Sequence, residues 1–234
     1  MDYKAAIDEN GFAVIPGVFS PGEIDHLIHM IDSAEGNKST FRKSGDLFAI
    51  RQFLKEVPAI KKTIFNTPLK QAIRDYFGSD YFIVKSIYFD KPERSNWFVS
   101  WHQDLTISTG KKTEEPGFGP WTVKQNQFAV QSPLNILENI YTIRIHLDET
   151  DESNGALKVL PGTHKRGIVR PADTDTSLGI NCSVPAGGVM IMKPLLLHSS
   201  GRTVNHRRRR VIHIELSDVK LPPGMNWSEK ENIW

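Results

Sequence analysis

The chain has 234 residues, of which 39% are hydrophobic and 24% charged, as in one globular domain and unlike a disordered or fibrous chain. No apolar run is long enough to span a membrane, and a formal charge of +2 argues against a nucleic-acid partner. The single cysteine, Cys182, and polar first residues without a signal-peptide pattern lead us to expect a cytoplasmic protein without disulfides.

Residues 1–80 are expected to form a mostly helical N-terminal support. The segment 20–23 has the sequence of a capping box with proline at the first helical position, so it predicts a helix. A second start signal at Thr67 precedes another amphipathic segment, and Gly78 is expected to end that helix. The apolar run at 47–54 between the two helices suits either a strand or a loop.

Residues 81–217 are expected to form the core of the domain. Short runs rich in β-branched and aromatic residues alternate there with turn-forming clusters, and no helical pattern lies between them. This pattern argues against a βαβ sheet and predicts a mainly-β jelly roll or cupin-like barrel. The eight expected strands are 81–90, 97–104, 139–148, 156–160, 181–184, 189–193, 196–199 and 209–217.

Two further segments complete the single domain that we expect over residues 1–234. Residues 110–133 are rich in Gly and Pro, and we expect them to form a long active-site loop over one mouth of the barrel. Residues 218–234 are expected to form a C-terminal tail. The sequence shows no internal repeat that would divide the domain further.

The sharpest local feature is a His-x-Asp pair, His102 and Asp104, on an expected strand. Residues two apart on a strand point to the same face, so the pair offers an imidazole and a carboxylate to one point. Such a pair alone occurs often by chance. His198 ends a very apolar segment, where a histidine is either a structural interior residue or a ligand in a rigid wall. Two histidines and one carboxylate form the facial triad of non-haem iron(II) oxygenases.

A basic run, residues 207–210, follows His198 and opens the last expected strand with Arg209. An arginine inside a barrel is unfavourable unless it pairs with an anion. A guanidinium matches a carboxylate bidentately, as binding of the dicarboxylate 2-oxoglutarate requires. The alternatives for the run are a solvated basic loop or a nucleic-acid patch, and the near-neutral total charge argues against the second.

Several motifs in this order resemble the phytanoyl-CoA dioxygenase family of iron(II)/2-oxoglutarate oxygenases, roughly over residues 81–217. They are Trp101-His102-Gln103-Asp104, Asn154-Gly155-Ala156-Leu157, Val159-Leu160-Pro161-Gly162-Thr163-His164-Lys165 and His198-Ser199-Ser200-Gly201, followed by Arg209. The resemblance implies a double-stranded β-helix with an N-terminal helical support. It implies iron(II), 2-oxoglutarate and dioxygen as cofactors, with His102, Asp104 and His198 as the metal ligands.

The resemblance also implies residues that bind 2-oxoglutarate. Arg209 matches the anchor of the distal carboxylate, although an insertion in the preceding loop would move this role to Arg208 or Arg210. Ser200 matches a hydroxyl that assists the anchor, and Gln103 matches a position that often reaches the co-substrate.

Two more basic residues are assigned to the co-substrate site. Arg144 stands where some relatives have an aromatic residue that contacts the co-substrate, so it binds a carboxylate either of 2-oxoglutarate or of the substrate. Lys85 alternates with Ile83 and Ile87 on an expected strand, and it faces either the same cavity or solvent.

The expected function is that of a non-haem iron(II)/2-oxoglutarate-dependent dioxygenase that hydroxylates a small organic metabolite and converts 2-oxoglutarate to succinate and CO₂. Asp104 favours hydroxylation over halogenation, because related halogenases lack this carboxylate. Five aromatic residues flank the presumed mouth and either line an apolar substrate pocket or pack the loop: Trp97, Trp101, Phe118, Trp121 and Phe128. The alternative function is a cupin-like barrel that binds another metal and does not use 2-oxoglutarate.

Overall fold

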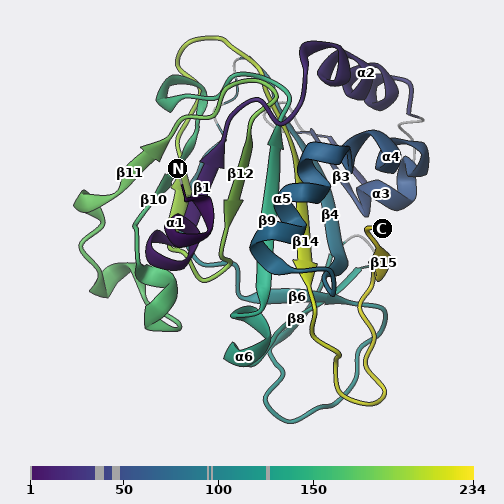
Figure 1. The fold of residues 1–234 in the computed structure, drawn as a ribbon. Helices are drawn as coiled ribbons and strands as arrows, with labels where there is room; N and C mark the ends of the chain where they lie inside the picture. Colours follow the sequence, from purple (N-terminus) through teal and green to yellow (C-terminus); the bar gives the residue numbers. More distant parts are fainter. Residues whose placement is uncertain (1, 35–39, 44–47, 94, 96, 125–126) are drawn as a thin grey trace.

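The computed structural model describes residues 2–34, 40–43, 48–93, 95, 97–124 and 127–234. Their strands form three antiparallel sheets, and the two larger sheets face each other around the interior of a jelly roll (Figure 1). Helices lie against the outer face of the largest sheet. The predicted mainly-β barrel with an N-terminal helical support is therefore confirmed.

The largest sheet forms one wall of the interior. Across the sheet, its strands follow the order β1 (Phe12–Ile15), β12 (Val189–Met192), β9 (Ile140–His146), β14 (Arg209–Ser217), β4 (Phe82–Lys91), β3 (Phe48–Arg51) and β2 (Phe41–Lys43). A short last strand, β15 (Glu231–Asn232), pairs with the beginning of β4. Alternation along β14 gives the sheet two different faces, since Ile212 and Ile214 pack against the helices while Arg209 and His213 face the interior.

The second sheet forms the opposite wall and is shorter. Its strands are β11 (Ile180–Cys182), β10 (Leu157–Val159), β13 (His198–Ser200) and β5 (Val99–His102). Apolar side chains from both walls fill one end of the interior, among them Val159, Met190 and Leu196. The other end is lined by polar and charged side chains, and that is where the candidate site lies.

The described part of the chain contains six α-helices, namely α1 (Tyr3–Asn10), α2 (Pro21–Asp32), α3 (Phe53–Glu56), α4 (Lys61–Ile64), α5 (Thr67–Phe77) and α6 (Leu134–Leu137). Two of them, α2 and α5, begin at the start signals that the sequence predicts. The capping box of α2 is present, because Ser20 Oγ accepts from the Glu23 N–H at 3.3 Å and Glu23 Oε2 accepts from the Ser20 N–H at 2.8 Å. Asn66 caps α5, and Gly78 follows its last residue.

The N-terminal part contains more β-structure than predicted. β1 extends one edge of the largest sheet beside β12, and β2 and β3 extend the other edge beside β4. The ambiguous run at 47–54 forms β3 and then enters α3, and residue 47 lies outside the described residues. The support is therefore part of the barrel wall as well as its helical cover.

The expected long loop at 110–133 contains a hairpin instead. β7 (Trp121–Lys124) and β8 (Gln127–Gln131) pair with each other, and β8 also pairs with β6 (Thr106–Thr109), which gives the third sheet. Apolar residues of this sheet, such as Ile107 and Val130, pack against Trp227 of the C-terminal tail. None of the described residues of 110–133 lines the candidate site.

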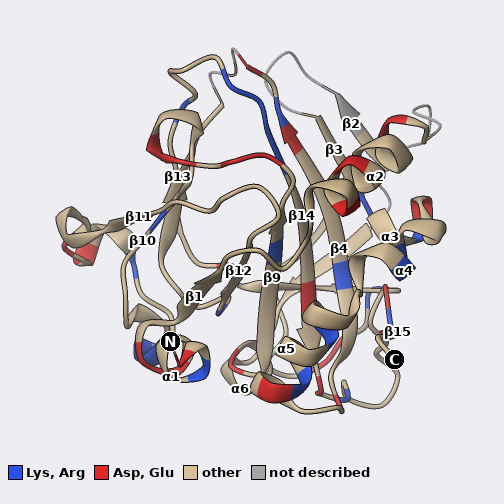
Figure 2. Cartoon of the chain, turned by 45° about the horizontal axis from the view of Figure 1, so that its top comes forward, with Lys and Arg blue, Asp and Glu red and all other residues tan. Residues whose placement is uncertain are grey.

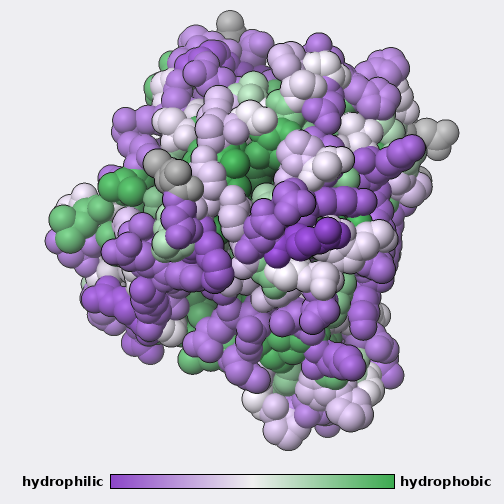
Figure 3. Space-filling view, in the orientation of Figure 1, coloured by the Kyte–Doolittle hydropathy of each residue, from purple (hydrophilic) through white to green (hydrophobic). Residues whose placement is uncertain are grey.

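Charged residues cover the surface and also enter the interior. Figure 2 shows both signs interspersed over the outside, with basic segments on β9 and β4 and an acidic segment on β14 within the sheet. On the face shown in Figure 3, hydrophobic residues appear as scattered small groups among hydrophilic ones. None of the helices in the described part of the chain combines the length and apolar character needed to cross a bilayer.

Candidate metal centre and adjoining cavity

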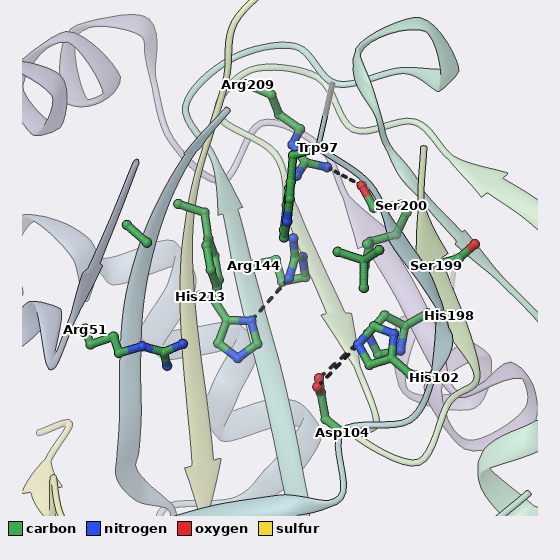
Figure 4. Close-up of a pocket in the computed structure, with 14 residues that line it drawn as sticks. Arg51, Trp97, His102, Asp104, Arg144, His198, Ser199, Ser200, Arg209 and His213 are labelled. Atoms are coloured by element: carbon green, nitrogen blue, oxygen red, sulfur yellow. Dashed lines mark hydrogen bonds and ion pairs between the residues drawn. The ribbon is translucent and has the colours of Figure 1, made fainter. Parts of the chain in front are cut away.

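The structure brings His102, Asp104 and His198 together at one point (Figure 4). His102 ends β5, His198 begins β13, and the two are register partners in the second sheet. Asp104 Oδ1 lies 3.7 Å from His102 Nε2, and Asp104 Oδ2 lies 3.7 Å from His198 Nε2. Because all three donor atoms lie within 4.8 Å of one another, they can ligate a single metal ion.

Backbone hydrogen bonds orient both imidazoles toward this point. His102 Nδ1 lies 2.8 Å from the Ser100 carbonyl oxygen, and His198 Nδ1 lies 2.8 Å from the Leu196 carbonyl oxygen. A carbonyl only accepts, so each Nδ1 carries the proton and each Nε2 presents a lone pair beside Asp104. Metal-binding histidines are held in this way, and the donor set therefore fits iron(II).

The electrostatics of the triad favour the ligating forms of its residues. Burial opposes ionisation of Asp104, but attraction to His198 and Lys85 outweighs it and lowers the pKa of Asp104 to about 2. Burial lowers the pKa of His198 to about 4, although Asp104 attracts its protonated form. At neutral pH the site thus holds a carboxylate and a neutral His198, the forms that bind a metal.

A cavity of about 330 Å³ opens beside the triad, between the two facing sheets (Figure 4). Its volume is near the lower end of the range for small-molecule pockets, roughly 300–1,000 Å³. Arg51 of β3, Arg144 of β9 and Arg209 of β14 line it, and Asp104 is the only acidic residue among its described lining residues. The cavity is therefore suited to a small anionic ligand.

Arg209 lies inside this cavity with 4% of its surface exposed. Its Nη1 donates to Ser200 Oγ at 3.2 Å and to the Gly155 carbonyl, which also accepts from Ser200 Oγ at 2.9 Å. Burial, followed by repulsion from Arg144, lowers the pKa of Arg209 to about 9. A buried guanidinium whose described partners are neutral oxygens favours a carboxylate ligand, as expected for the 2-oxoglutarate anchor.

The other three arginines of the basic run form ion pairs with acidic residues and do not line the cavity. Arg208 pairs with Asp90, Arg210 pairs with Asp148 at 2.6 Å, and Arg207 pairs with Glu149 at 2.9 Å and with Asp151. Because side chains alternate along β14, Arg209 is the member of the run that enters the interior. Of the three candidates for the anchor, the structure therefore favours Arg209 over Arg208 and Arg210.

Arg144 and Lys85 are linked through two buried residues in the interior. Arg144 Nη1 lies 3.2 Å from His213 Nδ1, and His213 Nε2 lies 3.2 Å from Glu215 Oε1. Lys85 Nζ lies 2.7 Å from the same Oε1. Lys85 is thus paired with Glu215 and is not a lining residue, whereas Arg144 lines the cavity.

Gln103 has a different position from the one expected for a co-substrate residue. Its side chain points away from the cavity and binds the backbone, with Nε2 donating to the Gly167 and Leu195 carbonyls at 2.9 and 2.6 Å. Its Oε1 accepts from the Val169 N–H at 2.9 Å. Gln103 directly follows the end of β5, and its contacts with the backbone direct its side chain away from the cavity and fix the segment around residues 167–169.

The expected aromatic lining is mostly absent from the described cavity. Trp97 lines it, but Trp101, Phe118, Trp121 and Phe128 do not. Phe118 and Trp121 pack instead against the apolar cluster of the third sheet. For these two residues the packing alternative is confirmed.

The lining residues that the sequence did not predict include Arg51, Phe89 and His213. The position of His213 could have been predicted, because residues 209, 211 and 213 point to the same face of the strand that contains Arg209. Arg51 and Phe89 come from paired strands β3 and β4, in which Ala49 lies opposite Phe89. Only the strand pairing brings them to the site, and that pairing is not visible in the local sequence.

Comparisons with known proteins agree with this architecture. The sequence profile of the family described as phytanoyl-CoA dioxygenase (PhyH) matches residues 7–211. The protein named phytanoyl-CoA dioxygenase domain-containing protein 1 homolog, from Caenorhabditis elegans, is 21% identical over 296 residues, which cover 98% of this chain and 93% of that protein.

Solved structures share the fold at low sequence identity. The apo form of the non-heme monooxygenase ThoJ has a TM-score of 0.71 and 14% identity, covering 97% of this chain and 80% of that one. HygX from Streptomyces hygroscopicus, solved with nickel, 2-oxoglutarate and hygromycin B, has a TM-score of 0.65 and 14% identity, covering 92% and 86%. The family profile spans most of the sequence, and the chain belongs to the phytanoyl-CoA dioxygenase family.

Proposed function

We propose that this protein is an iron(II)/2-oxoglutarate-dependent dioxygenase that hydroxylates a C–H bond of a small organic molecule. The observation that carries the proposal is the placement of two complementary groups in one cavity, the triad of His102, Asp104 and His198 and the Arg209–Ser200 pair. Family membership and the co-substrate seen in HygX support it. When bound, iron(II) and 2-oxoglutarate supply the oxidising chemistry, and 2-oxoglutarate leaves as succinate and CO₂.

The residues of the chain bind and orient the reactants. His102, Asp104 and His198 would hold the metal ion, which would bind the keto-acid end of 2-oxoglutarate and activate dioxygen. Arg209 binds the distal carboxylate, and Ser200 Oγ stands 3.2 Å from Arg209 Nη1 to assist. The Gly155 carbonyl fixes both side chains before the co-substrate arrives, so little ordering is left for binding to achieve.

Asp104 bears on the outcome of the reaction. Its carboxylate fills the ligand position that related halogenases leave for chloride, so we propose hydroxylation rather than halogenation. Ring closure, desaturation and epimerisation begin with the same hydrogen abstraction as hydroxylation, and Asp104 does not separate them from it. His198 and Arg209 are only 5% and 4% exposed, whereas the side chains of His102 and Asp104 are 38% and 30% exposed, so the cavity is closed around Arg209 and open to solvent at the triad.

The proposal is tested without a substrate, by anaerobic titration of iron(II) and 2-oxoglutarate into the metal-free protein. A visible charge-transfer band is expected from the chelated keto acid. His198→Ala should abolish the band, because it removes a ligand, and Arg209→Ala should weaken 2-oxoglutarate binding by about a hundredfold, since it removes a bidentate charge-assisted pair. The matched control is Arg210→Ala, whose side chain pairs with Asp148 outside the cavity, and it should keep the wild-type affinity.

A different result would move the assignment to another class. If the wild-type protein binds the metal but gives no band at saturating 2-oxoglutarate, the oxygenase proposal fails. The cupin-like alternative, a barrel that uses the same triad without 2-oxoglutarate, would then take its place.

A further inference from the structure

Arg144 is a buried cation without an acidic partner among the described residues. It is 8% exposed, its Nη1 contacts His213 Nδ1, and its Nε has no hydrogen-bond partner. None of its described contacts is an ion pair, and Asp104, which lines the same cavity, attracts it only at longer range. Burying an unpaired charge costs several kcal/mol, on the order of the penalty for any desolvated ion, so such a site favours an anionic ligand.

The hydrogen-bonded chain behind Arg144 shows that this charge is not neutralised internally. Arginine only donates, so His213 Nδ1 accepts and His213 Nε2–H donates to Glu215 Oε1. His213 is therefore neutral in this arrangement. Glu215 is matched by Lys85, whose Nζ lies 2.7 Å from Oε1. The chain thus orients Arg144 and contributes no negative charge to it.

With metal and 2-oxoglutarate bound in the cavity, as the proposed function requires, the charge of Arg144 would still lack a negative partner. The metal would be balanced by Asp104 and by the carboxylate at the keto end of 2-oxoglutarate. The distal carboxylate would balance Arg209, which Ser200 assists. Arg144 lines the same cavity and keeps its charge in that state. Binding of one further negatively charged group in the cavity would therefore be favourable.

We propose that Arg144 binds a carboxylate of the primary substrate, so that the enzyme acts on small carboxylic acids. The single positive charge of Arg144 is balanced by one negative charge. A carboxylate carries one negative charge, whereas a phosphate carries more than one. Figure 4 shows Arg144 pointing into the cavity between Arg209 and His213, on the side of the triad. A carboxylate bound there would hold the substrate beside the metal, because Arg144 and the triad line the same cavity.

The test uses acetate as the probe and acetamide as its neutral control. The protein is loaded with zinc and 2-oxoglutarate, a complex that is stable in air. Acetate binding is then measured by saturation-transfer NMR in a low-chloride zwitterionic buffer. Wild-type protein should bind acetate with a Kd in the millimolar range and should not bind acetamide. Arg144→Met should weaken acetate binding by about tenfold or more, whereas Arg144→Lys, which keeps the charge, should retain most of it.

A second arm compares two arginines of the same cavity. Arg209→Met should weaken 2-oxoglutarate binding by about a hundredfold, and Arg144→Met should change it by less than about threefold. Retention of zinc binding and of the circular-dichroism spectrum shows that each variant is folded.

Several results would overturn the inference. Equal acetate binding by wild type and Arg144→Met, or equal binding of acetate and acetamide, would show that Arg144 is not a carboxylate site. A loss of 2-oxoglutarate affinity in Arg144→Met as large as in Arg209→Met would assign Arg144 to the co-substrate and leave the proposed function intact. If wild-type protein does not bind 2-oxoglutarate, the proposed function itself fails, and that is seen before acetate is added.

Discussion

Gln103 stands between the candidate metal ligands His102 and Asp104, yet its side chain binds the backbone of a distant segment. Its amide satisfies the Gly167 and Leu195 carbonyls and the Val169 N–H, and the residue is only 8% exposed. Removing one partner of a buried hydrogen bond leaves the other unsatisfied, at a cost of about 1–3 kcal/mol for each group. At the scale of a residue, position in a motif therefore does not determine the role.

Gln103→Ala is expected to lower the free energy of unfolding by about 3 kcal/mol or more, because three backbone groups lose their partner, while leaving the affinity for 2-oxoglutarate unchanged. The measurement is urea denaturation together with the charge-transfer titration. Gln71→Ala, an exposed glutamine on α5, serves as the control and should change stability by less than about 0.5 kcal/mol. Loss of 2-oxoglutarate affinity without loss of stability would restore Gln103 to the co-substrate site.

At the scale of elements, the turn before β10 connects the second sheet to the part of the cavity that contains Arg209 and Ser200. It consists of the short 3₁₀ turn Glu152–Asn154 followed by Gly155, whose φ is 84°. A Cβ on Gly155 would lie 2.7 Å from the Gly201 carbonyl oxygen and 2.7 Å from Lys91 Nζ. The carbonyl of Gly155 also accepts from Arg209 and Ser200, so this turn positions both side chains.

Gly155→Ala should therefore both destabilise the protein and weaken 2-oxoglutarate binding. The left-handed conformation alone costs roughly 1–2 kcal/mol for a residue with a Cβ, and the two close contacts add to this. Thermal unfolding and the charge-transfer titration measure the two effects. Gly201→Ala is the matched control, because its Cβ would meet nothing within 4 Å, and it should behave as the wild type. Equal behaviour of the two variants would contradict this account.

The elements that were predicted well are those with a strong local pattern. β14 has the predicted bounds because apolar and polar residues alternate over residues 212–217, and α2 and α5 have caps in their sequences. β1 was missed because Phe12–Ile15 is a short apolar run that becomes a strand only by pairing with β12. The hairpin of the third sheet depends likewise on distant packing against the C-terminal tail. Gly and Pro around it indicated a loop.

The candidate site likewise has parts that the local sequence predicts and parts that depend on the pairing of distant strands. The His-x-Asp spacing of His102 and Asp104, although the strand itself ends at His102, and the family motifs around His198 and Arg209 identified the parts that the structure brings together. The unmatched charge of Arg144 could not be seen in the sequence. It depends on which strands pair and on Glu215 being matched by Lys85, a residue 130 positions away.

At the scale of the whole molecule, the C-terminal tail joins parts that lie far apart in the sequence. β15 pairs with β4, and Trp227 Nε1 donates to the Val219 carbonyl at 3.0 Å while its ring packs with the third sheet. Glu229, 1% exposed, accepts from the Ser86 N–H at 3.2 Å and from Ser86 Oγ on β4. The tail thus places a carboxyl group inside the protein.

This carboxyl group makes stability depend on pH. Burial raises the pKa of Glu229 from 4.5 to about 7, although the hydrogen bonds from Ser86 oppose the shift. Between these two values the folded protein holds a proton that the unfolded chain has lost. Stability therefore falls as the pH rises through this window, by about 3 kcal/mol in total at pH 8. His198, whose pKa is lowered to about 4, acts in the opposite direction between pH 4 and 6.5.

Glu229→Gln isolates the contribution of this carboxyl group, because glutamine keeps the shape of the protonated acid and does not titrate. We expect the variant to be close to the wild type in stability at pH 5 and more stable than it at pH 8, with the gap widening between the two. Thermal unfolding of both proteins at pH 5, 6, 7 and 8 measures it, and subtracting the two curves cancels the histidines that the proteins share. If the difference in stability between the two proteins is constant across this range, Glu229 is ionised in the folded protein throughout. The C-terminal tail would then place a carboxylate, and not a protonated carboxyl group, beside β4.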